Sequence, residues 1–307
     1  MISRRSIRVK VMQTLYAYET ANGGMTERQA RDILKGKMDQ SAGLFTYLVY
    51  LVTETARYVE TDAARRSSKH LPSEEDLNVN IKLAGNSLLW QTMEHPGFEE
   101  MVQKGGFFSM KDTELVRALF RKLSGTPEYT DYLSKPSRER HDERDILTFI
   151  FNDIMLPDED LDAHLTECFV NWEDDAEMMQ QMVLNYLHKP SAYDFFHIVS
   201  AEKRKYGDDL LRTAIEKQEL CLDHIRPKLK NWDAERIAHL DMIIMRLGVC
   251  EFLFFETIPA KVTINEYIDV AKEYSTTQSG QFVNGILDNI HKELEREGAL
   301  RKVEYRK

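Results

Sequence analysis

The segment from Trp232 to Asp288 constrains the fold most, because three amphipathic helix patterns follow one another there. Asp233 offers a cap for the first of them. The string Thr263-Ile264-Asn265-Glu266 has the spacing of a capping box for the second, and Ser279 offers a cap for the third.

Most of the remaining chain also has helical periodicity. Eight prolines and fourteen glycines in 307 residues leave long stretches uninterrupted, and we find no alternating strand pattern. The sequence therefore predicts an all-α fold, with an exposed connection over residues 135–144. Helices are expected over residues 7–18, 28–66, 79–93, 113–123 and 203–229, with two more within 145–189.

Composition favours a cytoplasmic protein with a buried core. Hydrophobic residues make up 42% of the chain, and no segment reaches the roughly 20 apolar residues of a membrane span. The start, MISRRSIRVKV, lacks the apolar run of a signal peptide. The cysteines Cys168, Cys221 and Cys250 are widely spaced and form no CxxC pair, which argues against disulfides and a zinc site.

The formal net charge of −10 comes from one part of the sequence. Between Arg144 and Lys189 there is no Lys or Arg, while residues 145–177 contain eleven Asp and Glu. Without this block the chain is close to neutral, so the overall acidity does not exclude nucleic-acid binding. We interpret the block as a solvated face, with Asp158 to Asp162 as an acidic helix start.

The motifs of common enzyme classes are absent from the sequence. There is no GxGxxG, no GxxxxGK[ST], no HExxH and no GxSxG, and the nine histidines form no ligand pair on a shared helix face. We therefore expect a protein without catalytic residues, bound metal or cofactor.

Two features suggest RNA binding instead. Arg4, Arg5 and Arg8 open the chain with Lys10, and no acidic residue precedes Glu19. Guanidinium groups bind phosphates and stack on bases. Phe282 stands at the threshold of the last helix, where a base could stack on its ring.

Read together, the two ends resemble the NusB family of bacterial transcription antitermination factors. The resemblance is carried by RRSIRVKVMQTLYAYE at the start and, near the end, by WDAERI, IIMRLGVCEFL, IPAKVTINEYIDVAKEY and FVNGILD, in that order. It implies an all-helical protein that binds boxA-type RNA together with the ribosomal protein NusE, in a transcription complex with RNA polymerase. Residues 1–22 would form the first core helix and 201–297 the C-terminal core. Residues 23–200 would form a helical insertion or expansion, and 298–307 a basic tail.

The resemblance also suggests roles for individual residues. Arg4, Arg5 and Arg8 match the family's arginine-rich start, although Ser6 stands where the family often has another Arg. Phe282 matches the aromatic against which a base packs. Gln278 and Ser279 precede it at a helix N-terminus, where amides can meet phosphate or a base edge; the family often has an acidic residue in place of Gln278.

Three further positions resemble those around the RNA or the NusE partner: Tyr16, Glu235 and Asp241. The two carboxylates could meet a basic ribosomal protein or be ordinary surface groups. By contrast, Glu251, Asn265, Glu266 and Lys272 are interpreted as structural groups that fix helix ends.

The leading hypothesis is thus a non-enzymatic RNA-binding antitermination factor that supports ribosomal RNA transcription. An alternative is a helical interaction scaffold whose RNA binding has been lost. A third hypothesis, an RNA cytosine methyltransferase fused to a NusB-like domain, requires an α/β cofactor domain that this sequence does not predict.

Overall fold

A computed structural model describes residues 1–229 and 237–303, and every regular element within them is a helix. The predicted all-α fold class is confirmed. None of the helices in these ranges has the length and apolar character that a membrane crossing requires. The chain forms two compact units, and α2 (Glu27–Ser67) contributes its first turns to one and its remainder to the other.

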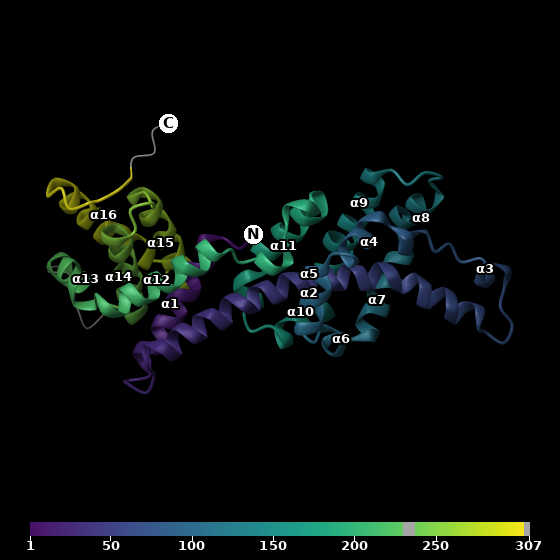
Figure 1. The fold of residues 1–307 in the computed structure, drawn as a ribbon, viewed down its shortest axis with the longest axis horizontal. Coiled ribbons are helices and arrows are strands. Elements are labelled where there is room, and N and C mark those ends of the chain that lie inside the picture. The colour runs from purple at the N-terminus through teal and green to yellow at the C-terminus, as the bar shows by residue number, and fades with distance from the viewer. Residues whose placement is uncertain (230–236, 304–307) are drawn as a thin grey trace. The chain divides into compact units, whose positions relative to one another are not determined.

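Unit 2 combines Ser3–Met38 with Ala201–Lys307. Within it, α14, α15 and α16 lie side by side, and α1 packs on α12 and α14 (Figure 1). Its remaining helices are α1 (Arg4–Thr20), α12 (Ala201–Glu216), α13 (Gln218–Ile225), a 3₁₀ turn at Arg226–Leu229, α14 (His239–Phe254), α15 (Ala260–Tyr274) and α16 (Ser279–Arg296).

The core of unit 2 centres on α14, which is buried on all sides from Ile243 to Phe252. Two glycines permit close helix contacts. A Cβ on Gly248 would lie 2.9 Å from the side chain of Leu287 on α16, and one on Gly207 would lie 2.9 Å from Ile7 on α1. A larger residue at either position would therefore force the neighbouring helix to repack.

The ends of these helices differ in places from the sequence prediction. Helix α1 ends at Thr20, just before Asn22 and Gly23, whose φ angles of +47° and +83° do not continue a helix. The expected helix over 203–229 is divided into α12, α13 and the 3₁₀ turn. The capping-box prediction is wrong, because α15 begins at Ala260 and Thr263 lies inside the helix with its hydroxyl bonded to Glu251.

Unit 1 combines Met1–Ile2 with Asp39–Ser200. The long second part of α2 runs through it, and shorter helices pack along this rod (Figure 1). These are α3 (Glu74–Leu77), α4 (Ser87–Met93), α5 (Pro96–Lys104), α6 (Phe107–Met110), α7 (Thr113–Ser124), α8 (Pro127–Ser134), α9 (Arg140–Phe149), α10 (Glu159–Cys168) and α11 (Trp172–His188), with 3₁₀ turns at Lys82–Gly85, Pro190–Ala192 and Phe195–His197 and a π-helical segment at Ile150–Met155.

Aromatic side chains fill much of the unit 1 core. Phe45 of α2 stacks on Tyr193 with ring centroids 5.5 Å apart, and Phe195 packs edge-on against Phe98 at 5.1 Å. Such pairs add to the stability gained from burying their area. A buried carboxylate, Glu143, accepts a hydrogen bond from the backbone of Ser87 at the start of α4.

The sequence predicted the longer helices of unit 1 best. The expected helices over 28–66 and 113–123 are confirmed as α2 and α7. Asp158 caps α10 by accepting from the Leu161 amide at 2.9 Å, as expected for an acidic helix start. The connection expected over 135–144 is shorter, because α9 already begins at Arg140.

Candidate nucleic-acid interface

Arg4 and Arg5 lie in the first turn of α1, after Ser3 caps it by accepting from the Ser6 amide at 3.1 Å. Both guanidinium groups are partly exposed, at 36% and 43%. Arg4 lies over the Tyr206 ring at 5.5 Å and donates to Glu202 at 2.5 Å. One side of the Arg4 guanidinium is thus exposed, although the group is already ion-paired with Glu202.

Arg5 is held by two carboxylates of α15. It donates to Glu273 at 2.8 Å and lies 3.4 Å from Asp269. The hydrogen bond to Glu273, opposed by partial burial and supported by both negative charges, raises the pKa of Arg5. Any phosphate that binds Arg5 must therefore compete with these carboxylates.

Arg8 belongs to the core, which corrects its prediction as an RNA-binding residue. Its side chain is 2% exposed, and it donates to both oxygens of Glu251, at 2.8 and 3.2 Å. A further bond reaches Glu266 at 3.1 Å. Burial opposes its charge, yet the pKa of Arg8 is raised because Glu251 stabilises the charged form. No phosphate can reach a guanidinium enclosed in this way.

Glu251 is the centre of this buried cluster. Its carboxylate also accepts from Tyr206 at 2.5 Å, Thr263 at 2.8 Å and Tyr267 at 3.0 Å. Burial raises the pKa of both phenols well above their usual value, so they remain donors. Glu251 and Glu266 are thus structural, as predicted, but they bind Arg8 and do not cap helix ends.

Asp241 and Ser279 pair with each other below the surface. The Ser279 hydroxyl donates to the Asp241 carboxylate at 2.8 Å and accepts from the Thr276 amide at 3.3 Å. Asp241 is 5% exposed and Ser279 is 3% exposed. Their predicted contacts with partner and RNA are therefore corrected: the pair joins the start of α14 to the start of α16.

The exposed groups at the start of α16 are different ones. Gln278 precedes the helix and is exposed, and Phe282 in its first turn is half-buried. Lys272 of α15 reaches the same place, because its aliphatic stem fills the space where Gly280 would carry a Cβ, 2.7 Å away. Its side chain is 61% exposed. The sequence analysis gave Lys272 a structural role and missed this exposed cation. The one sequence signal was Gly280, which leaves room for the Lys272 side chain.

Tyr16 lies on the exposed side of α1, at 43% exposure, with its ring 5.6 Å from that of His239. Glu19, one turn further, accepts from Arg246 and lies 3.1 Å from His239. The sequence gave no signal for His239, because tertiary packing alone brings it to α1. Glu235, like Trp232 and Asp233, lies outside the described residues.

Unit 2 thus presents two groups of exposed or half-buried side chains. Arg4 and Arg5 form the first; Gln278, Phe282 and Lys272 form the second. Arg5 binds α15 at Glu273, only five residues before Gln278. Guanidinium, ammonium, amide and aromatic groups are those that bind phosphates and stack on bases of single-stranded RNA.

The chain is similar to known proteins of one family. The model of the NusB family matches residues 164–292. A transcription antitermination protein NusB from Methylacidiphilum infernorum is 39% identical over 101 residues, which cover 33% of this chain and 70% of that protein. The chain belongs to the NusB family. The family match includes all of α14 and α15 and most of α16, and leaves out α1 with its arginines.

Other NusB proteins match over similar lengths. The protein from Salinibacter ruber is 38% identical over 99 residues, covering 32% of this chain and 62% of that protein. The protein from Geobacter sulfurreducens is 43% identical over 91 residues, covering 30% and 66%. A solved structure of T. maritima NusB has 32% identity, covers 40% of this chain and 82% of that chain, and has a TM-score of 0.29. The chain thus matches a little under two thirds of the length of the Salinibacter protein. The segment matched to the NusB family, residues 164–292, is less than half of the 307 residues of this chain.

Proposed function

We propose that this protein is a cytoplasmic, RNA-binding transcription antitermination factor that binds boxA-type RNA together with NusE, in a complex with RNA polymerase. The observation that carries the proposal is the start of α16. There Gln278, Phe282 and Lys272 are displayed by the helices that match the NusB family. We assign no catalytic step to the protein.

RNA contacts are divided between the two exposed groups. Arg4 and Arg5 bind phosphates by exchanging Glu202 and Glu273 for the RNA backbone. A base stacks on the exposed face of Phe282, with Gln278 hydrogen bonding beside it. Lys272 adds a cation close to this base. Arg8, Ser279 and Asp241 support these positions from within the unit.

The NusE contact is proposed for the side of unit 2 around Tyr16. This ring is exposed next to His239, whose imidazole lies 3.1 Å from the Glu19 carboxylate. Glu235 remains part of the proposed partner surface by resemblance. Residues 23–200 remain a proposed expansion of the family core.

An electrophoretic retardation experiment tests the function. The full chain, with and without NusE, is titrated into a boxA-type RNA and a scrambled RNA of the same length and composition at fixed salt, because phosphate contacts make affinity depend on salt. We expect stronger retardation of the boxA-type RNA, and NusE should increase the difference. Equal retardation of both RNAs would refute sequence-specific binding.

A further inference from the structure

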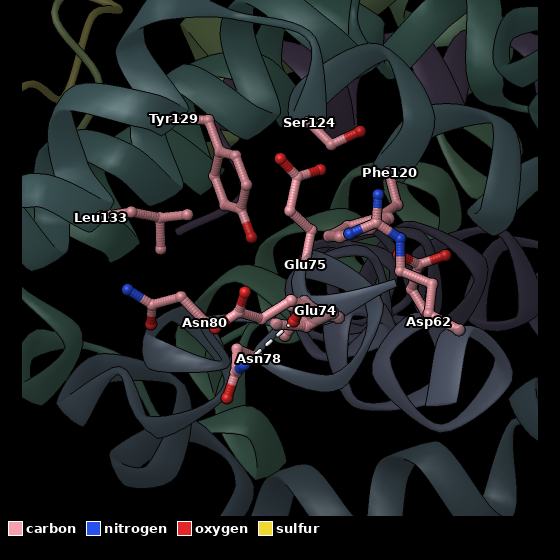
Figure 2. Close-up of a pocket in the computed structure, with 12 residues that line it drawn as sticks. Asp62, Glu74, Glu75, Asn78, Asn80, Phe120, Ser124, Tyr129 and Leu133 are labelled. Atoms are coloured by element: carbon pink, nitrogen blue, oxygen red, sulfur yellow. Dashed lines mark hydrogen bonds and ion pairs between the residues drawn. The ribbon is translucent and has the colours of Figure 1, made fainter. Parts of the chain in front are cut away.

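Unit 1 contains a cavity of about 550 Å³ that no proposed RNA contact uses. It opens between the end of α2, α3, the end of α7, and α8 (Figure 2). This volume lies within the range typical of sites for small molecules, roughly 300–1,000 Å³. Its lining lies outside residues 164–292, so the cavity is separate from the segment matched to the NusB family.

The polar side of the cavity is mainly acidic. Asp62, Glu74 and Glu75 line it, against one basic lining residue, Arg66. Arg66 is already engaged by Asp62 at 3.4 Å and Asp76 at 3.8 Å. Glu74 and Glu75 are exposed to the cavity, and neither forms an ion pair within the part of the chain that the structure describes (Figure 2). The cavity therefore attracts positive charge.

A buried phenol supplies the independent indication of a ligand. Tyr129 of α8 is 6% exposed, and its hydroxyl points into the cavity between Glu75 and Asn80 (Figure 2). Within residues 1–229 and 237–303 this hydroxyl has no hydrogen-bond partner. Burial raises the pKa of Tyr129 to about 12, so the group stays a neutral phenol whose oxygen can accept. The ring is buried while the hydroxyl opens to the cavity, so a ligand held there can donate a hydrogen bond to the phenolic oxygen.

The remaining wall is apolar. Phe120 is 3% exposed and meets the Tyr129 ring edge-on at 6.2 Å, and Val59 and Leu133 continue this surface. Such a wall suits an aliphatic chain, and aromatic faces also attract cations. An ammonium group has three donors and no acceptor, which matches the carboxylates of Glu74 and Glu75 and the phenolic oxygen of Tyr129 on this lining.

We propose that this cavity binds a small aliphatic amine, with ammonium groups on Glu74, Glu75 and the Tyr129 oxygen and the carbon chain against Phe120. An anion would face three carboxylates and is excluded by charge. The proposal goes beyond the RNA-binding function and does not depend on it, because the cavity and the proposed RNA contacts share no residue.

Isothermal titration calorimetry of the full chain with 1,4-diaminobutane tests the proposal. We expect saturable binding with one site per chain, and none for 1,4-butanediol, which has the same length without charge. Tyr129→Phe should weaken binding about fivefold, and Glu75→Gln about tenfold, as expected for one lost hydrogen bond and one lost charge-assisted bond. Tyr129→Phe keeps the ring, so the fold is preserved.

The matched control is Glu100→Gln, an exposed glutamate of α5 that does not line the cavity. It removes the same charge and should leave binding unchanged. Equal weakening by Glu100→Gln and Glu75→Gln would show general attraction to an acidic protein and overturn the proposal. A lysine-containing peptide is titrated in parallel, and binding of the peptide without binding of the free diamine would overturn it as well.

Discussion

Arg8 and Glu251 form a two-bonded ion pair across 243 positions of the chain, and both side chains are almost completely buried. The pair ties the first turns of α1 to the last turn of α14. Two phenols and a threonine complete the hydrogen bonds of the carboxylate. An arginine that the sequence places beside two surface arginines is thus part of the core of unit 2.

Replacing Arg8 by Ala should lower the free energy of unfolding by about 3–5 kcal/mol, because it leaves Glu251 charged and buried without a partner. Arg4→Ala, which removes an exposed ion pair with Glu202, should cost less than about 1 kcal/mol. Urea unfolding followed by circular dichroism measures both. Similar small losses in the two variants would contradict the structural role of Arg8.

Periodicity could not separate Arg8 from Arg4 and Arg5. Helix α1 is buried on consecutive positions from Ser6 to Met12, because α12 and α14 cover different sides of it. A helix surrounded in this way has no single apolar stripe, and a buried arginine has the same residue type as an exposed one. The sequence predicted the helix and its basic start correctly, but burial depended on α12 and α14, which lie far away in the sequence.

The joint variant Arg4→Ala with Arg5→Ala should make RNA binding less dependent on salt. Each lost phosphate contact on single-stranded RNA reduces the slope of log K against log salt concentration by about 0.7, so we expect a reduction of about 1.4. Filter binding over a salt series measures this slope. Arg212→Ala with Arg226→Ala is the matched control, since both arginines are exposed and ion-paired on the same unit. An equal change in the control would indicate a general charge effect.

Glu273→Gln should increase RNA affinity, by up to about fivefold. The carboxylate holds Arg5 at 2.8 Å, and neutralising it removes a competitor for phosphate as well as a repulsive charge. The same titration in Arg5→Ala provides the control, because Glu273→Gln should then have little effect. Weaker binding of RNA by Glu273→Gln would show that the ion pair positions Arg5 for RNA instead of blocking it.

Short helices are a second feature that could not be predicted from the sequence. Helices α5, α6 and α8 have between four and nine residues, too few turns to establish a period of 3.6. The caps of α5 and α8 could have been found, because Pro96 and Pro127 each stand at a helix start after a capping residue. The cavity beside α8 could not, since its lining comes from three separate segments spread over residues 59–133.

Phe282→Leu should weaken RNA binding about tenfold while leaving the fold intact. Leucine keeps apolar contact at a half-buried position but has no ring on which a base can stack, and such stacking contributes about 1–3 kcal/mol. Ser279→Ala is the contrasting variant, because it removes the donor to buried Asp241 and should destabilise unit 2 by about 1–3 kcal/mol. Retardation and thermal unfolding of both variants separate the two roles. Unchanged RNA binding by Phe282→Leu would remove Phe282 from the interface.

Lys302 makes the stability of unit 2 depend on pH. Although the sequence placed it in a basic tail, its ammonium group donates to the backbone carbonyls of Glu251 at 2.7 Å and Phe255 at 2.8 Å, at the end of α14. Burial lowers the pKa of Lys302 from 10.5 to about 8. The unfolded chain therefore binds this proton more tightly, so we expect the contribution of Lys302 to stability to rise as pH increases from about 8 to 10.5.

The difference in unfolding free energy between the wild type and Lys302→Met isolates this effect from other titrating groups. We expect the difference to change in favour of the wild type as pH rises through that window, because the neutral amine keeps its donors without the cost of a buried charge. Urea unfolding at several pH values measures it. Lys261→Met, at an exposed lysine of α15, is the matched control. A pH-independent difference for Lys302→Met would show that Lys302 keeps its proton throughout, held by the carbonyls at the end of α14.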